Sequence, residues 1–352
     1  MDTYKTKFSC WQGFPPPQYI YSNMRFKGVA LEPPSYEPGS WIGAGKALLD
    51  HENREFYLTA RPRKVEGGVR GYAANIYKSA DGVAFDLVKS LSKEEIIETS
   101  KVRIDSIEGT QLLKDPLTGK WHFYISVDTG SEFIWGGVFW ETLLLVADDL
   151  KGPWESKGLV VRHDRSYDAC QARDSSIDIV DGQWSGLFKA YDYEGNQRMQ
   201  LITSSDGVSW KKHGLLTVDG KEADMFYTSG SIFPGASGPI FLGVSRTASM
   251  PDSPVEDIFH DKWKLDFALW DYHFVAYRID FKGPNLETIF RAPWVARSEF
   301  EHEEHPLHNY CSVVHDPFEE RVLLYVEAIG RDSKNPTLNE SVERVLVFEC
   351  SL

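Results

Sequence analysis

Cysteine is scarce in this chain of 352 residues. The four that occur are far apart and form no CxxC pair; they are Cys10, Cys170, Cys311 and Cys350. Zinc ribbons and disulfide-rich secreted scaffolds need closely and regularly spaced cysteines. The spacing here is typical of neither class.

Long apolar runs are also missing. No stretch approaches the roughly 18 apolar residues that a membrane-spanning helix needs. The first residues, MDTYKTKFSCWQGFPPPQYIY, lack the apolar central region of a signal peptide. We therefore expect a cytoplasmic protein with no membrane partner.

Basic residues are outnumbered by acidic ones. Lys and Arg total 38 against 52 Asp and Glu, for a net charge of -14, and no basic stripe interrupts this excess. Such a chain does not attract phosphate backbones, so we expect no nucleic-acid partner. Aromatic residues, by contrast, are plentiful, with 11 Trp and 16 Tyr. Their flat rings bury large areas and also stack on sugars.

Helical periodicity is scarce, and residues 92–101 and 254–263 are the best short candidates for helices. What the chain has instead is a repeat. A strand, a polar turn and a second strand recur five times, beginning near residues 47, 111, 176, 231 and 312. Four of the copies are followed by another apolar strand and an Asp/Gly turn, in IYKSADGVAFD, LLVADDLKGPWES, LITSSDGVSWKKHG and, more weakly, YRIDFKGPNLETIF. This is the pattern of successive β-hairpins.

Units of about four short strands, repeated five times, predict an all-β fold, a five-bladed β-propeller, because radial repetition protects sheet edges. We assign residues 38–352 to the propeller and residues 1–37 to a segment that wraps around it or helps to close it. The extra length before the fifth unit is expected to be an insertion between strands of the fourth blade. A β-sandwich or two all-β domains are the alternatives.

Aligning the five hairpins on their turns brings one position of each into register, seven residues before the turn. These positions are Gly43, Glu108, Asp174, a residue near Tyr227 or Thr228, and Asn309. The innermost strands of a propeller line one channel, so equivalent positions converge on its mouth. Glu108 and Asp174 are therefore expected to approach each other, and paired carboxylates are suited to acid–base chemistry. The alternative is that they cap turns or pair with Arg103 and Arg173.

These motifs resemble the five-bladed propeller glycosidases of glycoside hydrolase families 43, 32 and 130. ARDSSI is similar to the Arg-Asp-Pro motif of the fructosidases of family 32, and IEGTQLLKDPLTGKWHFYIS to the blade that carries the general acid in family 43. HNYCSVV with LLYVEA, and YLTARPR, are similar to elements of the fifth and first blades in family 130. The resemblance implies a glycosidase that acts at the centre of the propeller.

The chain departs from these families at two positions. Families 43 and 32 place an Asp at the entry of the first blade, where this chain has Gly43, and family 130 uses an Asp where this chain has Glu108. The identity of the base, the linkage and the sugar therefore stay open.

The mechanism expected from the sequence assigns three carboxyl groups. Glu108, with its pKa raised by burial, protonates the leaving oxygen, and Asp174 acts as base or balances charge. Asp105 is the reserve carboxylate, with capping of the strand entry as its alternative role.

Substrate contacts are expected from residues at the same entries. Arg173 orients Asp174 or binds a substrate oxygen. Arg61 and Arg63 are expected to face opposite sides of their strand, so that at most one of them points into the channel. Trp41 and Tyr227 are candidates for stacking on a sugar. The remaining predicted contacts are His308 and Asn309. EFEHEEHPLH (299–308) is interpreted as an acidic loop and not as a metal site, so we expect no metal and no cofactor.

Two other functions fit the same residues. A phosphorylase would use Arg61, Arg63 and Arg173 to hold phosphate opposite the leaving group. A non-catalytic propeller would bind sugar without cleaving it, which the missing carboxylate at Gly43 would permit. The oligomeric state is open.

Overall fold

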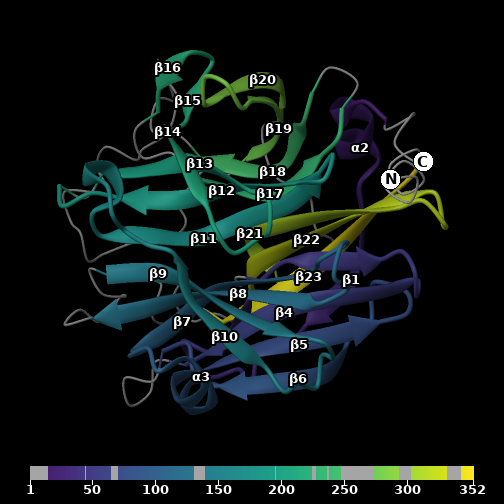
Figure 1. Cartoon of the computed structure of the whole chain (residues 1–352). Helices are drawn as coiled ribbons and strands as arrows, with labels where there is room; N and C mark the ends of the chain where they lie inside the picture. The colour runs from purple at the N-terminus through teal and green to yellow at the C-terminus, as the bar shows by residue number, and fades with distance from the viewer. Residues whose placement is uncertain are drawn as a thin grey trace.

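The computed structural model describes ten stretches of the chain. They are residues 15–43, 45–64, 70–130, 139–194, 196–223, 227–235, 238–246, 273–292, 303–330 and 342–352. Nearly all of their regular structure is β-strand, which confirms the predicted all-β class (Figure 1). The helices of these stretches are α2 (Pro17–Asn23), α3 (Lys93–Ser100) and the 3-10 turn η3 (Ser166–Asp168), and none of them is long and apolar enough to cross a membrane.

Strands that follow one another in the chain pair in antiparallel fashion, in five successive runs. The first run is β3 (Ala47–Asp50), β4 (Glu55–Arg63), β5 (Ala73–Ser79) and β6 (Asp86–Ser92). The second is β7 (Ser106–Lys114), β8 (Trp121–Gly130), β9 (Phe139–Ala147) and β10 (Glu155–Val161). The third is β11 (Gln171–Val180), β12 (Gln183–Tyr191), β13 (Gln197–Ser204) and β14 (Lys211–Leu215).

The last two runs complete this pattern. The fourth is β17 (Tyr227–Phe233), β18 (Ile240–Arg246), β19 (His273–Asp280) and β20 (Asn285–Arg291). The fifth is β21 (Glu303–Asp316), β22 (Arg321–Gly330), β23 (Glu343–Ser351) and, from the start of the chain, β1 (Arg25–Leu31). The five hairpins predicted from the repeat are therefore confirmed.

Three short strands connect or extend these runs: β2 (Trp41–Gly43), β15 (Thr217–Val218) and β16 (Lys221–Glu222). β2 pairs with both β4 and β23 and thereby joins the first and last runs into a nine-stranded sheet. One pairing between β9 and β11 makes an eight-stranded sheet of the second and third runs. A six-stranded sheet contains the fourth.

The first strands of the five runs lie against one another. β7 contacts β11, β11 contacts β17, and β17 contacts β21, while β3 contacts both β21 and β7. Figure 1 shows β21 and β22 between the teal strands β11–β18 and the blue strands β4–β6. The residues at the starts of these strands are thereby brought to one region of the molecule.

The hairpin turns are built by the aspartates that aligned the repeat. Asp50, Asp115 and Asp316 each accept a hydrogen bond from the backbone amide two residues later, at 3.0 to 3.1 Å. In the third hairpin Asp181 and Gly182 both have positive φ, 51° and 81°, as a tight turn between twisted strands requires. Turn chemistry therefore fixes the register in which each pair of strands meets.

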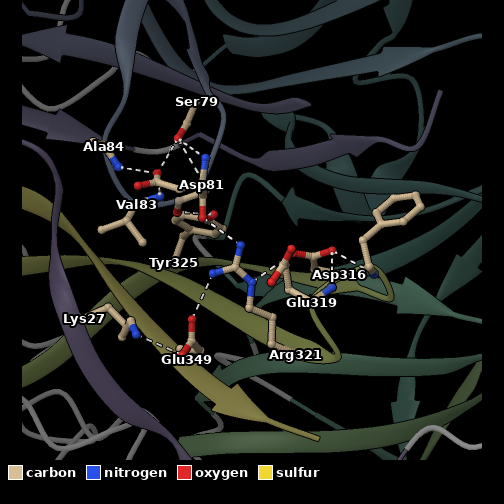
Figure 2. Close-up of polar contacts among 12 residues, drawn as sticks. Lys27, Ser79, Asp81, Val83, Ala84, Asp316, Glu319, Arg321, Tyr325 and Glu349 are labelled. Atoms are coloured by element: carbon tan, nitrogen blue, oxygen red, sulfur yellow. Dashed lines mark hydrogen bonds and ion pairs between the residues drawn. The ribbon is translucent and has the colours of Figure 1, made fainter. Parts of the chain in front are cut away.

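A charged cluster joins the two ends of the repeat (Figure 2). Arg321 at the start of β22 donates to Asp316 at 2.9 Å, to Glu349 of β23 at 2.9 Å and to the carbonyl of Asp81 at 2.8 Å. Lys27 of β1 reaches the same Glu349 at 3.0 Å. The turn after β5, the last hairpin and the first strand are thus held at one point.

The predicted helix at 92–101 is confirmed as α3. Ser92 and Glu95 form a reciprocal capping box, with bonds of 3.1 and 2.7 Å. The other predicted helix, at 254–263, lies outside the described residues. The prediction of an acidic loop at 299–308 is wrong from Glu303 onward, because β21 begins there. Pairing with β22 there recruits the backbone into the sheet despite the charged side chains.

Candidate active site

Three polar residues are placed by β-bulges at equivalent points of three first strands. The pairing of β7 with β8 shifts register between Ile107 and Thr110, which leaves Glu108 in the bulge. The pairing of β11 with β12 shifts after Arg173, around Asp174, and that of β21 with β22 shifts around Tyr310. Bulges re-aim side chains and are common beside active sites. Here they turn all three residues toward one another.

The hydroxyl of Tyr310 connects the two carboxylates. It lies 2.9 Å from Oδ2 of Asp174 and 3.4 Å from Oε1 of Glu108. The convergence of Glu108 and Asp174 expected from the sequence is therefore present in the structure. Glu108 has 13% of its side chain exposed, whereas Asp174 has 1%.

Asp174 is held by donors on several sides. Lys189 lies 2.7 Å from its Oδ2, and the backbone amide of Gly109 donates to its Oδ1 at 3.1 Å. Its own backbone amide donates to Ser126 at 2.9 Å, and its φ is 54°. Asp is one of the few side chains that tolerate such a φ, and the bulge imposes it.

These contacts keep Asp174 ionised. Burial by itself raises the pKa of this carboxyl, but the charges of Arg173 and Lys189 and the hydrogen bonds from Lys189 and Tyr310 bring it well below its usual range. Burial lowers the pKa of Lys189 to about 8. It raises the pKa of Tyr310 well above its ordinary value, with the charge of Asp174 adding to the effect. At neutral pH Tyr310 therefore keeps the proton that it donates.

The protonation state predicted for Glu108 is wrong. Burial pushes its pKa upward as expected, but the charges of Arg61 and Arg173 outweigh burial, so the net pKa is lowered. An Arg61 guanidinium nitrogen makes a direct ion pair with Oε1 of Glu108. The sequence did not indicate that Arg61 would contact Glu108, and this contact decides whether the pKa of Glu108 is raised or lowered.

The facing expected for the two arginines of β4 is also wrong. Residues two apart on a strand share a face, and both guanidinium groups lie over the ring of Trp41, Arg61 at 5.5 Å and Arg63 at 4.0 Å. All three side chains are buried. Trp41 therefore supports two cations, and contact between its ring and a sugar stays a prediction.

Arg173 is fixed by its neighbours. Its Nε donates to Gln171 at 2.9 Å, and its guanidinium lies over the buried ring of Trp140 at 4.4 Å. Nη1 is 3.6 Å from Asp174. In the sheet Arg173 stands directly opposite Lys189 of β12. The predicted link between Arg173 and Asp174 is thus present, with a second cation beside it.

Glu327 of β22 is a third carboxyl group in this region. A Cβ atom added at Gly43 would lie 2.5 Å from the Cδ of Glu327, so the carboxyl fills the space that a side chain at Gly43 would take. Burial and the neighbouring charge of Glu343 raise the pKa of Glu327 well above its ordinary value, although Arg61 opposes them. Burial and Glu343 therefore favour the protonated form of Glu327. It lines a small cavity together with Tyr310.

The other predicted residues are placed less centrally. Asp105 precedes β7, and its carboxylate accepts from Arg103 at 2.9 and 3.0 Å, a contact that the sequence offered as an alternative for Glu108 and Asp174 and not for Asp105. Tyr227 is buried edge-on against Tyr310, with Lys189 4.4 Å above its ring. His308 and Asn309 belong to β21, but their side chains are outside the described part of the chain.

Lys189, Tyr310 and Glu327 were missed by sequence reasoning. Tyr310 is one position from Asn309 because the bulge in β21 displaces the register by one residue. Lys189 and Glu327 lie on second strands, whereas the alignment considered only first strands. A cross-strand search opposite Arg173 and Asn309 would have found both. Within the described residues no group of three His, Cys, Asp or Glu side chains is arranged to hold a metal ion.

Comparisons with known proteins find likeness in fold but not in sequence. No sequence-family profile matches the chain, and no curated protein matches it. An N-acetylgalactosamine deacetylase from F. plautii, solved with blood group B trisaccharide, has a TM-score of 0.62 at 12% identity and covers 93% of this chain and 95% of its own. Zg3597, a family 117 glycoside hydrolase of the marine bacterium Zobellia galactanivorans, has a TM-score of 0.61 at 12% identity, covering 94% and 91%.

A thermostable family 43 glycoside hydrolase has a TM-score of 0.56 at 12% identity and covers 87% of this chain and 88% of its own. The resemblance to the propeller glycosidases is thereby confirmed at the level of the fold. At such identities the likeness extends to the fold alone, and a fold hosts more than one chemistry.

Proposed function

We propose that this chain is a glycoside hydrolase built as a five-bladed β-propeller, with the reaction at the cluster of Glu108, Asp174 and Tyr310. The five antiparallel runs of strands and the contacts among their first strands support the architecture. The observation that carries the function is that two carboxylates on separate strands share the Tyr310 hydroxyl. Glycosidic cleavage uses such a pair of carboxyl groups.

The charges of the site support distinct roles. Glu108 is ionised and partly exposed, so we assign it the role of base or nucleophile toward the sugar. Asp174 is ionised but buried and fixed by Lys189, which suits it to stabilise positive charge that develops on the sugar ring. This reverses the acid role that the sequence predicted for Glu108.

The reaction also needs a proton donor for the leaving oxygen. Glu327 is a carboxyl of this region whose pKa is raised well above its ordinary value, and the charge of Arg61 acts on both Glu327 and Glu108. Sites that separate the pKa values of neighbouring carboxyl groups assign acid and base in this way. We therefore assign the proton to Glu327.

Turnover of aryl glycosides with good and poor leaving groups tests these roles. We expect Glu108→Gln and Asp174→Asn to lower kcat/KM roughly 10²- to 10⁴-fold on every substrate. Glu327→Gln should impair substrates with poor leaving groups and spare those with dinitrophenolate, whose departure needs no proton.

Glu55→Gln is the matched control, because Glu55 pairs with Lys78 on the surface. Loss of the dinitrophenyl reaction in Glu327→Gln, together with its survival in Glu108→Gln, would return the acid role to Glu108. Turnover that none of the three changes affects would refute the site. Turnover only in the presence of inorganic phosphate would identify a phosphorylase instead.

A further inference from the structure

Two cations face each other across the third hairpin. Arg173 of β11 and Lys189 of β12 are direct cross-strand partners, and both are largely buried. Like charges in this position destabilise a sheet. Asp174 is the carboxylate that contacts them both, at 3.6 Å from Arg173 and 2.7 Å from Lys189. One carboxylate thus serves two cations.

The surplus of positive charge extends across the site. Arg61 is matched by Glu108, so three cations are set against two carboxylates. Burial favours the protonated forms of Glu327 and Tyr310, which add no charge. The positive charge of Arg63 is opposed by the negative charge of Glu343, so these two groups add nothing to the surplus. A site of net positive charge in a chain of net charge -14 favours an anionic ligand.

Arg173 has the donors to bind such a ligand. Its Nε is used by Gln171, but Nη1 lies beyond hydrogen-bond distance of Asp174, and neither Nη1 nor Nη2 donates to any group in the described residues. The guanidinium carbon of Arg173 lies 4.4 Å from the centroid of the Trp140 ring, and 13% of the side chain is exposed. Nη1 and Nη2 together offer a two-pronged donor of the kind that matches the two oxygens of a carboxylate.

We propose that Arg173, with Lys189 beside it, binds the carboxylate of a uronic acid, so that the substrate is an acidic glycoside. This rests on the proposed function for the cleavage but not for the binding. A guanidinium fork pairs with the two oxygens of a carboxylate and equally with phosphate, which would be the anion of a phosphorylase. Binding of the two anions is distinguishable by direct titration.

The test is calorimetric titration of the full chain with glucuronate, galacturonate, mannuronate and iduronate, each beside its neutral parent sugar, and with inorganic phosphate. We expect a uronate to bind and its neutral parent to bind at least tenfold more weakly. Arg173→Gln should weaken uronate binding roughly 10- to 100-fold, as loss of hydrogen bonds to a charged group does. Arg173→Lys keeps the positive charge but loses the two-pronged donor, so its affinity for the uronate should lie between those of the wild type and Arg173→Gln.

Arg278→Gln is the matched control, since Arg278 pairs with Glu287 on the surface. Equal binding of uronates and neutral sugars, or uronate binding that Arg173→Gln and Arg173→Lys both leave intact, would overturn the proposal, as would phosphate binding in place of uronate binding. Uronate binding that depends on Arg173 without glycoside turnover would support it and refute the hydrolase. Turnover of neutral glycosides alone would support the hydrolase and overturn the proposal of an acidic substrate.

Discussion

At the scale of single residues, two glycines are required for carboxyl groups to approach the backbone. A Cβ atom at Gly109 would lie 2.8 Å from Oδ1 of Asp174, the oxygen that the Gly109 amide binds. A Cβ atom at Gly43 would likewise overlap the carboxyl group of Glu327. Both positions lack a side chain because a carboxyl from another strand fills the space. Gly43, the position at which families 43 and 32 have an Asp, is therefore explained by the packing of Glu327 against it.

Gly43→Ala is expected to destabilise the fold by about 1–3 kcal/mol, because the new methyl group overlaps buried Glu327. Glu327→Asp withdraws the carboxyl by one methylene, so the double variant should recover part of this loss. Urea unfolding of the four proteins in the cycle measures the coupling. Gly28→Ala is the control, since its Cβ would meet Val83 at an ordinary 3.7 Å. Strict additivity of the two changes would contradict the contact.

At the scale of elements, the same turn recurs after β5 and after β13. In SADGVAF and SSDGVSW the serine hydroxyl and the aspartate carboxylate bind the same set of backbone amides, and Gly82 and Gly207 have φ of 74° and 70°. Each glycine carbonyl accepts from a buried tyrosine of another run, Tyr325 at 2.7 Å and Tyr124 at 2.6 Å. These turns therefore attach neighbouring runs of strands to each other.

Removing either tyrosine hydroxyl should weaken this attachment. Tyr124→Phe and Tyr325→Phe are each expected to cost about 1–3 kcal/mol, because the carbonyl of Gly207 or Gly82 stays buried without its donor. Chemical denaturation provides the measurement. Tyr193→Phe is the control, since that side chain is 73% exposed and should change stability by less than about 0.5 kcal/mol. Equal costs at buried and exposed sites would refute the role of the turns.

At the scale of the whole molecule, ionisable side chains tie the first strands together. Lys46 donates to Ser229 at 2.6 Å and to the carbonyl of Cys311 at 2.6 Å, and so connects the start of β3 to β17 and β21. Asp178 of β11 accepts from the amide of Ile232 of β17 at 2.7 Å. Burial lowers the pKa of Lys46 to about 8 and raises that of Asp178 to about 7. Folding is therefore linked to pH through the interior.

The sign of this linkage follows from Asp178. Its pKa is about 7 in the folded chain and about 3.9 in an unfolded one, so between these values the folded state binds more protons. The stability that Asp178 contributes is complete below about pH 4 and is lost as the pH rises through about 7. Asp178→Asn should remove this loss, so its stability relative to the wild type should improve by roughly 1–3 kcal/mol from pH 5 to pH 8.

Urea unfolding at the two pH values gives the comparison. Asp50→Asn is the matched control, because hydrogen bonds from Asn53 and Lys114 outweigh burial and lower the pKa of Asp50. Its contribution is lost only in acid, so that variant should keep the wild-type difference between pH 5 and pH 8. If Asp178→Asn shows the same change in stability between pH 5 and pH 8 as the wild type, Asp178 is not the group that links folding to pH in this range.

The sequence by itself determined the all-β class, the five hairpins and the convergence of Glu108 with Asp174. These follow from local rules, since turn aspartates set the register of each hairpin and a repeat places equivalent residues alike. Only the tertiary structure decided which cations meet which carboxylates. Arg61 beside Glu108 and Lys189 beside Asp174 fix the sign of each pKa shift, and the bulge in β21 substitutes Tyr310 for its neighbour. Charge interactions depend on distances across strands far apart in sequence, and no local pattern encodes those distances.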